Sequence, residues 1–118
     1  MVFRAERTLS GHRNIVVSCC FSPDGKKVLS ASHDSTLKIW LASDGALLHT
    51  LSGHDAVVNS CCFSPDGKEV LSVSVDWTLK IWLVSDGALL HTLSGHDGDV
   101  YSCCFSPDGK KVLQLTGH

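Results

Sequence analysis

The sequence repeats itself every 42 residues, and this period constrains the fold more than any other feature. The dipeptide Gly-His begins a unit at Gly11, Gly53 and Gly95, and Ser-Pro-Asp-Gly follows at the same distance each time. Residues 11–52 and 53–94 differ at only nine positions. A unit this short cannot bury its own apolar side chains, so successive units must stack on one another.

The period divides the chain into one continuous array without a linker. Two complete units occupy residues 11–52 and 53–94. A partial third unit covers 95–118, and residues 2–10 look like the last strand of a preceding unit. The third unit leaves the repeat register after Leu113.

Each unit has the pattern of short strands separated by turns. In the second unit the apolar run 57–63 precedes Ser-Pro-Asp-Gly, a sequence typical of a tight turn, and 68–74 forms the return strand. Residues 78–82 alternate apolar and polar side chains, and 88–93 follow another turn sequence, Ser-Asp-Gly. We therefore expect an all-β chain with four antiparallel strands in each complete unit.

Three motifs together suggest a family. Gly-His, Ser-Pro-Asp-Gly and Ser-x-x-x-Asp-x-Thr-Leu-Lys-Ile-Trp, at this spacing, resemble the WD40 repeat β-propellers. The resemblance implies that each unit is one four-stranded propeller blade. One departure is that leucine follows Trp40 and Trp82, where the family has aspartate. Propellers close with about four to eight blades, so we expect an incomplete ring from one chain.

Each complete unit also contains a histidine, a serine, an aspartate and a tryptophan at fixed spacing. The resemblance implies that they form a structural hydrogen-bond network, and we expect no enzyme activity and no cofactor. A Ser/His/Asp hydrolase is the alternative, although a catalytic set is normally assembled once, and the strained G-x-S-x-G turn is missing. The two sets are His12, Ser30, Asp34 and Trp40, and His54, Ser72, Asp76 and Trp82.

Two adjacent cysteines precede the proline turn in every unit, as at Cys19 and Cys20. Adjacent strand residues face opposite ways and there is no Cys-x-x-Cys motif, so we expect no metal site. Stacked sheets lie about 10 Å apart, which is too far for a disulfide between units. We interpret the cysteines as small apolar packing residues, with redox or metal use as the alternative.

One edge of the array carries most of the variation between units. In a four-stranded meander the first and third turns lie at one edge of the sheet, and the second turn and the connection between units lie at the other. Six of the nine differences fall at or beside this second edge, which we interpret as a partner-binding face; drift of loosely packed loops is the alternative. Trp77, where the first unit has Ser35, would be its anchor. The predicted face comprises Arg13, Asn14, Val17, His33, Ser35, Asp55, Asn59, Val75, Trp77, Asp99 and Tyr101.

The overall charge does not favour a nucleic-acid or membrane partner, since the net charge is −2. No apolar run reaches the roughly 20 residues of a spanning helix, and no secretion signal begins the sequence, so we expect a cytoplasmic protein. We predict a scaffold that binds proteins or peptides and forms a homo-oligomer, a closed multi-chain propeller in which the leading strand of one copy completes the third unit of another. The alternatives are the sensor array of a larger signalling protein and an engineered or recently amplified propeller fragment.

Overall fold

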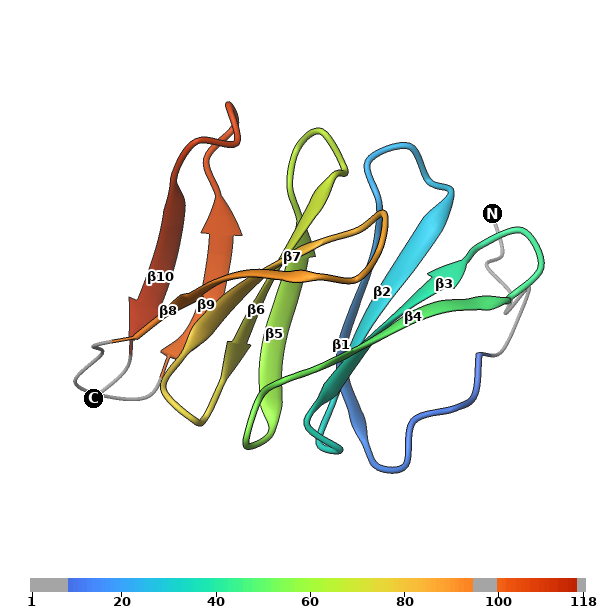
Figure 1. The fold of residues 1–118 in the computed structure, drawn as a ribbon, viewed down its shortest axis with the longest axis horizontal. Helices are drawn as coiled ribbons and strands as arrows, with labels where there is room; N and C mark the ends of the chain where they lie inside the picture. The colour runs from blue at the N-terminus through green and yellow to red at the C-terminus, as the bar shows by residue number, and fades with distance from the viewer. Residues whose placement is uncertain (1–8, 95–99, 117–118) are drawn as a thin grey trace, which may run out of the picture.

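The computed structural model describes residues 9–94 and 100–116, with side chains for 9–94 and 105–112. Two four-stranded antiparallel sheets and one two-stranded sheet follow one another along the chain (Figure 1). The first sheet contains β1 (Val16–Phe21), β2 (Lys27–Ser32), β3 (Thr36–Leu41) and β4 (Leu47–Ser52). The second contains β5 (Val58–Phe63), β6 (Glu69–Ser74), β7 (Leu79–Leu83) and β8 (Leu89–Leu93). The third pairs β9 (Val100–Phe105) with β10 (Val112–Thr116).

The expected fold class is confirmed: the described chain is all β, and each complete unit is one meander sheet of four strands. The strands of the second unit agree with the predicted ranges to within about one residue. Differences of this size are expected, because a sequence pattern indicates that a strand is present more reliably than it indicates where the strand ends. The three sheets do not close a ring (Figure 1). No helix among the described residues has the length and apolarity to cross a membrane.

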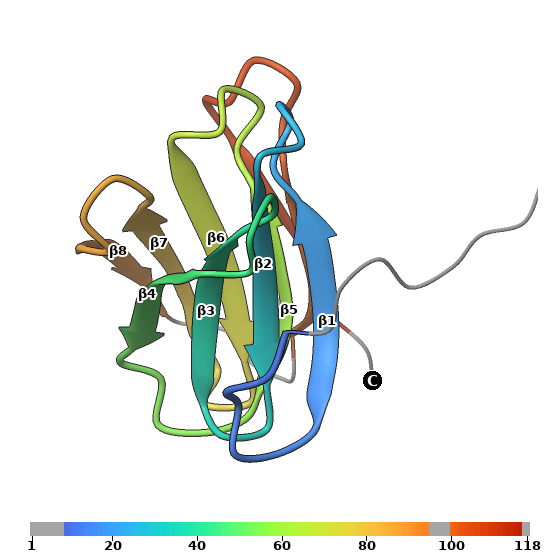
Figure 2. The ribbon, with the colours of Figure 1, turned by 90° about the vertical axis from the view of Figure 1, so that its right-hand side faces the viewer.

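The sheets stack so that their first strands are neighbours. β5 lies between β1 and β9, and Cα atoms of β5 come within 8 Å of both (Figure 1). Figure 2 shows the first two sheets one behind the other, with β4 and β8 on the side away from β1 and β5. β10 continues to Thr116 although the repeat pattern ends after Leu113, and it stays paired with β9.

The proline turn forms in the same way in all three units. In the first, Asp24 Oδ1 accepts hydrogen bonds from Ser22 Oγ at 2.6 Å and from the Lys26 amide at 2.9 Å. Gly25 has a φ of 74°, a left-handed conformation that glycine adopts without strain. Gly67 and Gly109 repeat this value. The Ser-Pro-Asp-Gly sequence that recurs in the three units thus adopts the same backbone conformation each time.

Backbone hydrogen bonds place the turns at two opposite edges, as predicted. At the first edge the Ala42 amide, in the β3–β4 turn, donates to the Lys26 carbonyl of the β1–β2 turn at 2.9 Å. At the second edge the His33 amide, in the β2–β3 turn, donates to the Ile15 carbonyl just before β1, also at 2.9 Å. The second edge therefore gathers the two connections in which the units differ most.

The core lies between the sheets. Leu29 and Ile39 of the first sheet pack with Val58 and Val70 of the second, and all four are fully buried. Burying an aliphatic side chain of this size contributes about 1.5–3 kcal/mol. Leu71 points the other way, into a second cluster that includes residues of the third sheet. Each blade is thus held mainly by its neighbours, as expected for a repeat array.

The outer face of the first sheet has no other sheet packed on it among the described residues. Val16 is 48% exposed, whereas its counterpart one unit later, Val58, is fully buried. Cys19 is exposed while its counterpart Cys61 is buried. These differences between equivalent positions outline the surface that a preceding blade would cover.

Candidate functional site

The four residues predicted as a network form a single hydrogen-bonded chain in each complete unit. In the second unit, Trp82 Nε1 donates to Ser72 Oγ at 2.9 Å, and His54 Nε2 lies 2.7 Å from the same oxygen. His54 Nδ1 lies 3.0 Å from Asp76 Oδ2. The chain runs from the buried sheet to the second edge. His12, Ser30, Asp34 and Trp40 repeat these contacts in the first unit at 2.6–2.9 Å.

The residues at the two ends of this hydrogen-bonded series, the tryptophan and the aspartate, determine which atoms donate and which accept. An indole nitrogen can only donate, and a carboxylate can only accept. His54 must therefore carry its proton on Nδ1, facing Asp76, and accept the Ser72 hydroxyl hydrogen on Nε2. Burial lowers the pKa of His54 despite the opposing influence of Asp76, so the imidazole is neutral.

Asp76 ties the second edge together. Besides His54, its carboxylate accepts hydrogen bonds from the amides of Thr78 and Asp55, each at 3.0 Å, and from the Thr78 hydroxyl. Partial burial would raise the pKa of this carboxyl, but these hydrogen bonds outweigh burial and lower it to about 2. The pKa of Asp34 is lowered in the same way. The charged carboxylates hold the inter-unit connection against the β2–β3 or β6–β7 turn.

The glycine before each network histidine allows close packing against tryptophan. A Cβ atom at Gly53 would lie 3.1 Å from Cη2 of Trp82, and one at Gly11 would lie 3.0 Å from Cη2 of Trp40. Real Cβ atoms rarely come this near to a ring carbon, so a larger residue would push the indole or the loop aside. The Gly-His motif therefore provides both the space and the hydrogen bonds of the network.

The order Asp–His–Ser is also that of a hydrolase triad, but in the second unit the surroundings prevent this chemistry. Ser72 is fully buried, and its oxygen already accepts the Trp82 indole hydrogen. A nucleophilic serine must reach a substrate carbonyl beside an oxyanion site. With no exposed oxygen at Ser72, the arrangement can fix loops but cannot attack a substrate.

The described members of the predicted partner-binding face lie at the second edge. Arg13 and Asp55 are exposed, and their amides donate to the network carboxylates of Asp34 and Asp76. Asn14 is exposed and accepts a hydrogen bond from the next amide in the chain. Asp99 lies outside the described residues, and for Tyr101 only the backbone in β9 is described.

Two of these positions lie where the first strand of each sheet is irregular. The β1–β2 register shifts between Val16 and Ser18, and the β5–β6 register shifts at the equivalent place, around Asn59. A bulge of this kind re-aims a side chain and often lies near a functional surface. Val17 is 40% exposed and Asn59 is half-buried. Sequence reasoning did not predict the bulges, because no glycine or proline signals them.

The β2–β3 and β6–β7 turns contain the two positive φ angles of non-glycine residues among the described residues. Ser35 has a φ of 73° and Trp77 a φ of 68°. This left-handed region is uncommon for non-glycine residues, and for a bulky one it is an outlier. Trp77 is also 49% exposed, and the neighbouring Val75 is 39% exposed. His33 is exposed and Ser35 half-buried at the corresponding places of the first unit.

The four described cysteines, Cys19, Cys20, Cys61 and Cys62, are not joined in disulfides. The sheet spacing expected from flat packing is nevertheless too large here, because Cys20 on the first sheet packs against the buried cluster that contains Cys61 on the second. Cys61 Sγ also lies 3.9 Å from Ser18 Oγ. The value of about 10 Å applies to flat sheets packed face to face, whereas these sheets have first strands that come within 8 Å. Among the described residues, no group of three or more His, Cys, Asp or Glu could hold a metal ion.

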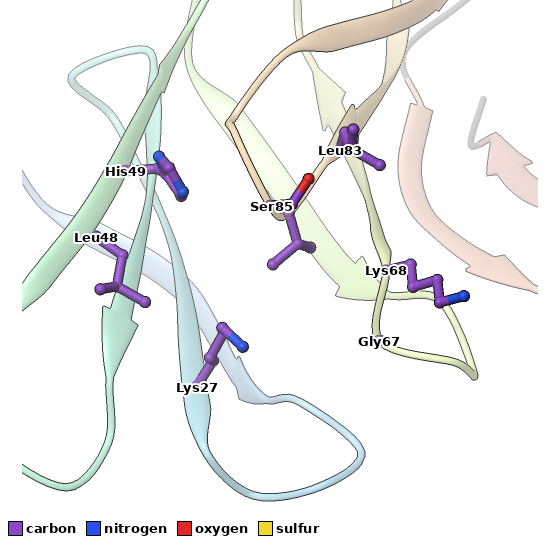
Figure 3. Close-up of a pocket in the computed structure, with 8 residues that line it drawn as sticks. Lys27, Leu48, His49, Gly67, Lys68, Leu83 and Ser85 are labelled. Atoms are coloured by element: carbon purple, nitrogen blue, oxygen red, sulfur yellow. The ribbon is translucent and has the colours of Figure 1, made fainter.

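A groove of about 680 Å³ lies between the first two sheets at the first edge, where we predicted no site. Figure 3 shows Lys27, Leu48 and His49 around it, together with Lys68, Leu83 and Ser85 of the second sheet. One signal in the sequence could have indicated it, because the equivalent of Lys27 in the second unit is Glu69. The two lysines give this groove a basic rim.

Comparison with known families agrees with this architecture. The family model described as WD domain, G-beta repeat matches residues 3–40, 45–82 and 87–118. The chain therefore belongs to the WD40 repeat family. Proteins of this family serve as protein-interaction scaffolds and are generally not enzymes.

Individual relatives match the chain over about one repeat. Vegetative incompatibility protein HET-E-1 of Podospora anserina is 51% identical over 39 residues, 33% of this chain and 3% of that protein. Small ribosomal subunit protein RACK1 of Neurospora crassa is 50% identical over 40 residues, 34% of this chain and 13% of that protein. Ribosome assembly protein 4 of Saccharomyces cerevisiae is 40% identical over 40 residues, 34% of this chain and 8% of that protein. These matches span a small part of each relative.

Proposed function

We propose that the chain is a non-enzymatic scaffold that binds a protein or peptide at its second edge. The observation that carries this proposal is Trp77, a half-exposed indole held on a left-handed turn. Strained, exposed aromatic residues gather at functional sites more often than elsewhere, and Trp is enriched among interface hot spots. The fold does not require an aromatic side chain here, since Ser35 adopts the same backbone conformation in the first unit.

The surroundings of Trp77 favour a partner with an apolar side chain flanked by polar groups. Val75 extends the exposed apolar surface on the same turn. Asp55 and Asn59 place polar side chains on the connection and strand that face this edge. An apolar centre with a polar rim is the common organisation of a protein-binding surface. Metals, cofactors and nucleic acids have no part in this proposal.

The direct test is a screen of displayed peptides against the whole chain, followed by affinity measurement for two variants. Trp77→Ser restores the residue of the first unit and therefore keeps the turn. Ala42→Val is the matched control, because it introduces the second-unit residue, found at Val84, on the opposite edge. We expect Trp77→Ser to weaken binding at least about tenfold, as for a hot-spot residue, and Ala42→Val to leave it unchanged. Equal affinity of selected peptides for Trp77→Ser would refute the proposed face.

We also propose that copies of the chain assemble into a closed multi-chain propeller. The internal interface supports this, because an identical valine is buried at position 58 and exposed at position 16. At the other end Leu93 is 37% exposed, although its counterpart Leu51 is 1% exposed. A second copy placed in the register of the internal blade pair would cover both surfaces.

Native mass spectrometry of the whole chain tests this assembly. We expect a single species containing several chains, and we expect Val16→Asp to convert it to monomer by placing a charge in the new interface. Val75→Asp, at a similarly exposed valine of the second edge, is the matched control and should preserve the assembly. A wild-type monomer at micromolar concentration would exclude the closed multi-chain ring while leaving peptide binding at Trp77 testable.

The setting in the cell is also part of the proposal. We place the scaffold in the cytoplasm, and imaging of a fluorescently labelled chain in the source cells would test this. A sensor array of a larger signalling protein is a second candidate function, favoured by the nearly identical units 11–52 and 53–94. Peptide binding at Trp77 is expected for both candidates, whereas multi-chain assembly of this chain is expected only for the first.

A further inference from the structure

Cys20 and Cys61 are two thiols on the neighbouring first strands of the first two sheets. Cys20 is half-buried on β1, and Cys61 is buried on β5, the neighbouring first strand. Cys20 packs against the buried cluster that contains Cys61, and Cα atoms of the two strands approach within 8 Å. This approach is compatible with the separation of up to about 7 Å that a disulfide requires between its Cα atoms.

The repeated cysteine dipeptide explains why the second cysteine of the first unit, Cys20, lies near the first cysteine of the second unit, Cys61. Adjacent residues of a strand point to opposite faces of the sheet. On β5, Cys61 belongs to the core shared with the first sheet, whereas Cys62 packs against the cluster shared with the third. The second cysteine of one unit therefore meets the first cysteine of the next. The 42-residue period puts positions 62 and 103 in the corresponding register across the next interface.

Cys20 is accessible to a small oxidant. It lines an open cavity of about 320 Å³, together with Phe21, Phe63 and Phe105. The interaction with Cys61 lowers the pKa of Cys20 to about 7, against the opposing effect of burial. Near neutral pH a large fraction of Cys20 is therefore thiolate, the form of cysteine that reacts with peroxides.

We propose that Cys20 and Cys61 are an oxidation site at which hydrogen peroxide forms a disulfide between neighbouring blades. The Cys20 thiolate attacks one peroxide oxygen, so that an S–O bond forms, the O–O bond breaks and the released hydroxide takes a proton to leave as water. Cys61 then loses its proton and attacks the Cys20 sulfur of the sulfenic acid. The S–S bond forms, the S–O bond breaks and a second water leaves. The two sulfurs together give two electrons to the peroxide.

The disulfide would join β1 to β5 and so lock the contact between two blades. Because the linked residues are 41 positions apart, the bond closes a long loop and restricts the unfolded chain. Oxidation is therefore expected to raise the denaturant concentration needed to unfold the protein. This effect is independent of peptide binding at Trp77 and of assembly.

The test compares two variants that each keep two cysteines and replace the other four by serine. The first keeps Cys20 and Cys61. The second, a matched control, keeps Cys19 and Cys62, the same two repeat positions on faces that do not meet. Both are treated with hydrogen peroxide at neutral pH and analysed by intact mass spectrometry and thiol alkylation, after circular dichroism has verified that they are folded.

We expect the first variant to lose about 2 Da and both alkylatable thiols, with recovery on reduction, and the control to form no intramolecular disulfide. Retained thiols or added oxygen in the first variant, without the 2 Da loss, would overturn the proposal. If the four substitutions prevent folding, peptide mapping of the peroxide-treated wild-type chain replaces them. A linked Cys20–Cys61 peptide then supports the site, and its absence from oxidised protein overturns it.

Discussion

At the scale of single residues, the histidine network explains how a short unit holds its loops. His54 connects a buried serine to a carboxylate at the second edge, and each polar side-chain atom of this network has a hydrogen-bond partner. Buried polar groups are tolerated only when they are paired in this way. The resemblance to WD40 repeats implied the members of the network, whereas the neutral state of His54 depends on burial, which only the structure shows.

Removing the central hydroxyl tests the network. Ser72→Ala leaves the Trp82 indole hydrogen and the His54 Nε2 atom without their partner in a buried site. We expect the free energy of unfolding to fall by about 1–3 kcal/mol, the usual penalty for such groups. Denaturant titration measures it, with the exposed Ser85→Ala as the control. No loss of stability would mean that the network does not support the blade.

The same residues make stability depend on pH. The folded protein holds His54 neutral, while the unfolded chain binds a proton below the usual pKa near 6.5, so stability falls as pH drops through this value. The pKa of the Asp76 carboxyl is 3.8 in the unfolded chain and about 2 in the folded protein. Between these two pH values the unfolded chain takes up a proton that the folded protein does not, so further stability is lost in that range.

Thermal melting across this pH range measures both steps. Comparison of His54→Gln with the wild type isolates the first step, which the variant should lack, while the loss due to Asp76 should remain. A melting temperature that rises as the wild type is acidified below pH 6.5 would contradict the neutral histidine.

At the scale of strands and turns, the fold was predictable where local chemistry is regular. The alternating run at 78–82 and the Ser-Pro-Asp-Gly turn place β7 and the β5–β6 turn, because period-2 burial and left-handed glycine leave few alternatives. The left-handed Trp77 was not predictable, since nothing in its side chain favours that conformation. The packing of Cys20 against the cluster that contains Cys61 was missed because it depends on how closely two sheets approach.

The close approach of glycine to tryptophan gives a prediction at this scale. In Gly53→Ala the new Cβ would lie 3.1 Å from Trp82, so the loop or the indole must move. We expect a loss of about 1–3 kcal/mol, typical of overpacking. Ser52→Ala, an exposed neighbour, is the control for denaturant titration. Unchanged stability of Gly53→Ala would show that the loop relaxes freely.

At the scale of the whole molecule, the stacking of nearly identical units places the same residue type in two environments, one buried and one exposed. Val58 is buried between sheets, and Val16 occupies the same place on the open face. In an isolated chain Val58→Ala should cost about 2 kcal/mol, by analogy with other large-to-small core changes, and Val16→Ala much less. In an assembled ring both should cost about the same.

Unfolding both variants at increasing protein concentration separates these cases. If copies associate, the difference between Val16→Ala and the wild type should grow with concentration, because association stabilises the folded state by mass action. Val58→Ala is the internal reference at each concentration. A small effect of Val16→Ala at every concentration would count against association through this face.

The shared left-handed turn of Ser35 and Trp77 has a broader consequence. The same backbone accepts a small hydroxyl residue and a large aromatic one, so conformation and side-chain identity are uncoupled at this position. Each blade can therefore present a different side chain at this position of the second edge without a change in its backbone. An array of such blades could acquire a new specificity through a single codon change, or through exchange of whole units by recombination, while its architecture stayed the same.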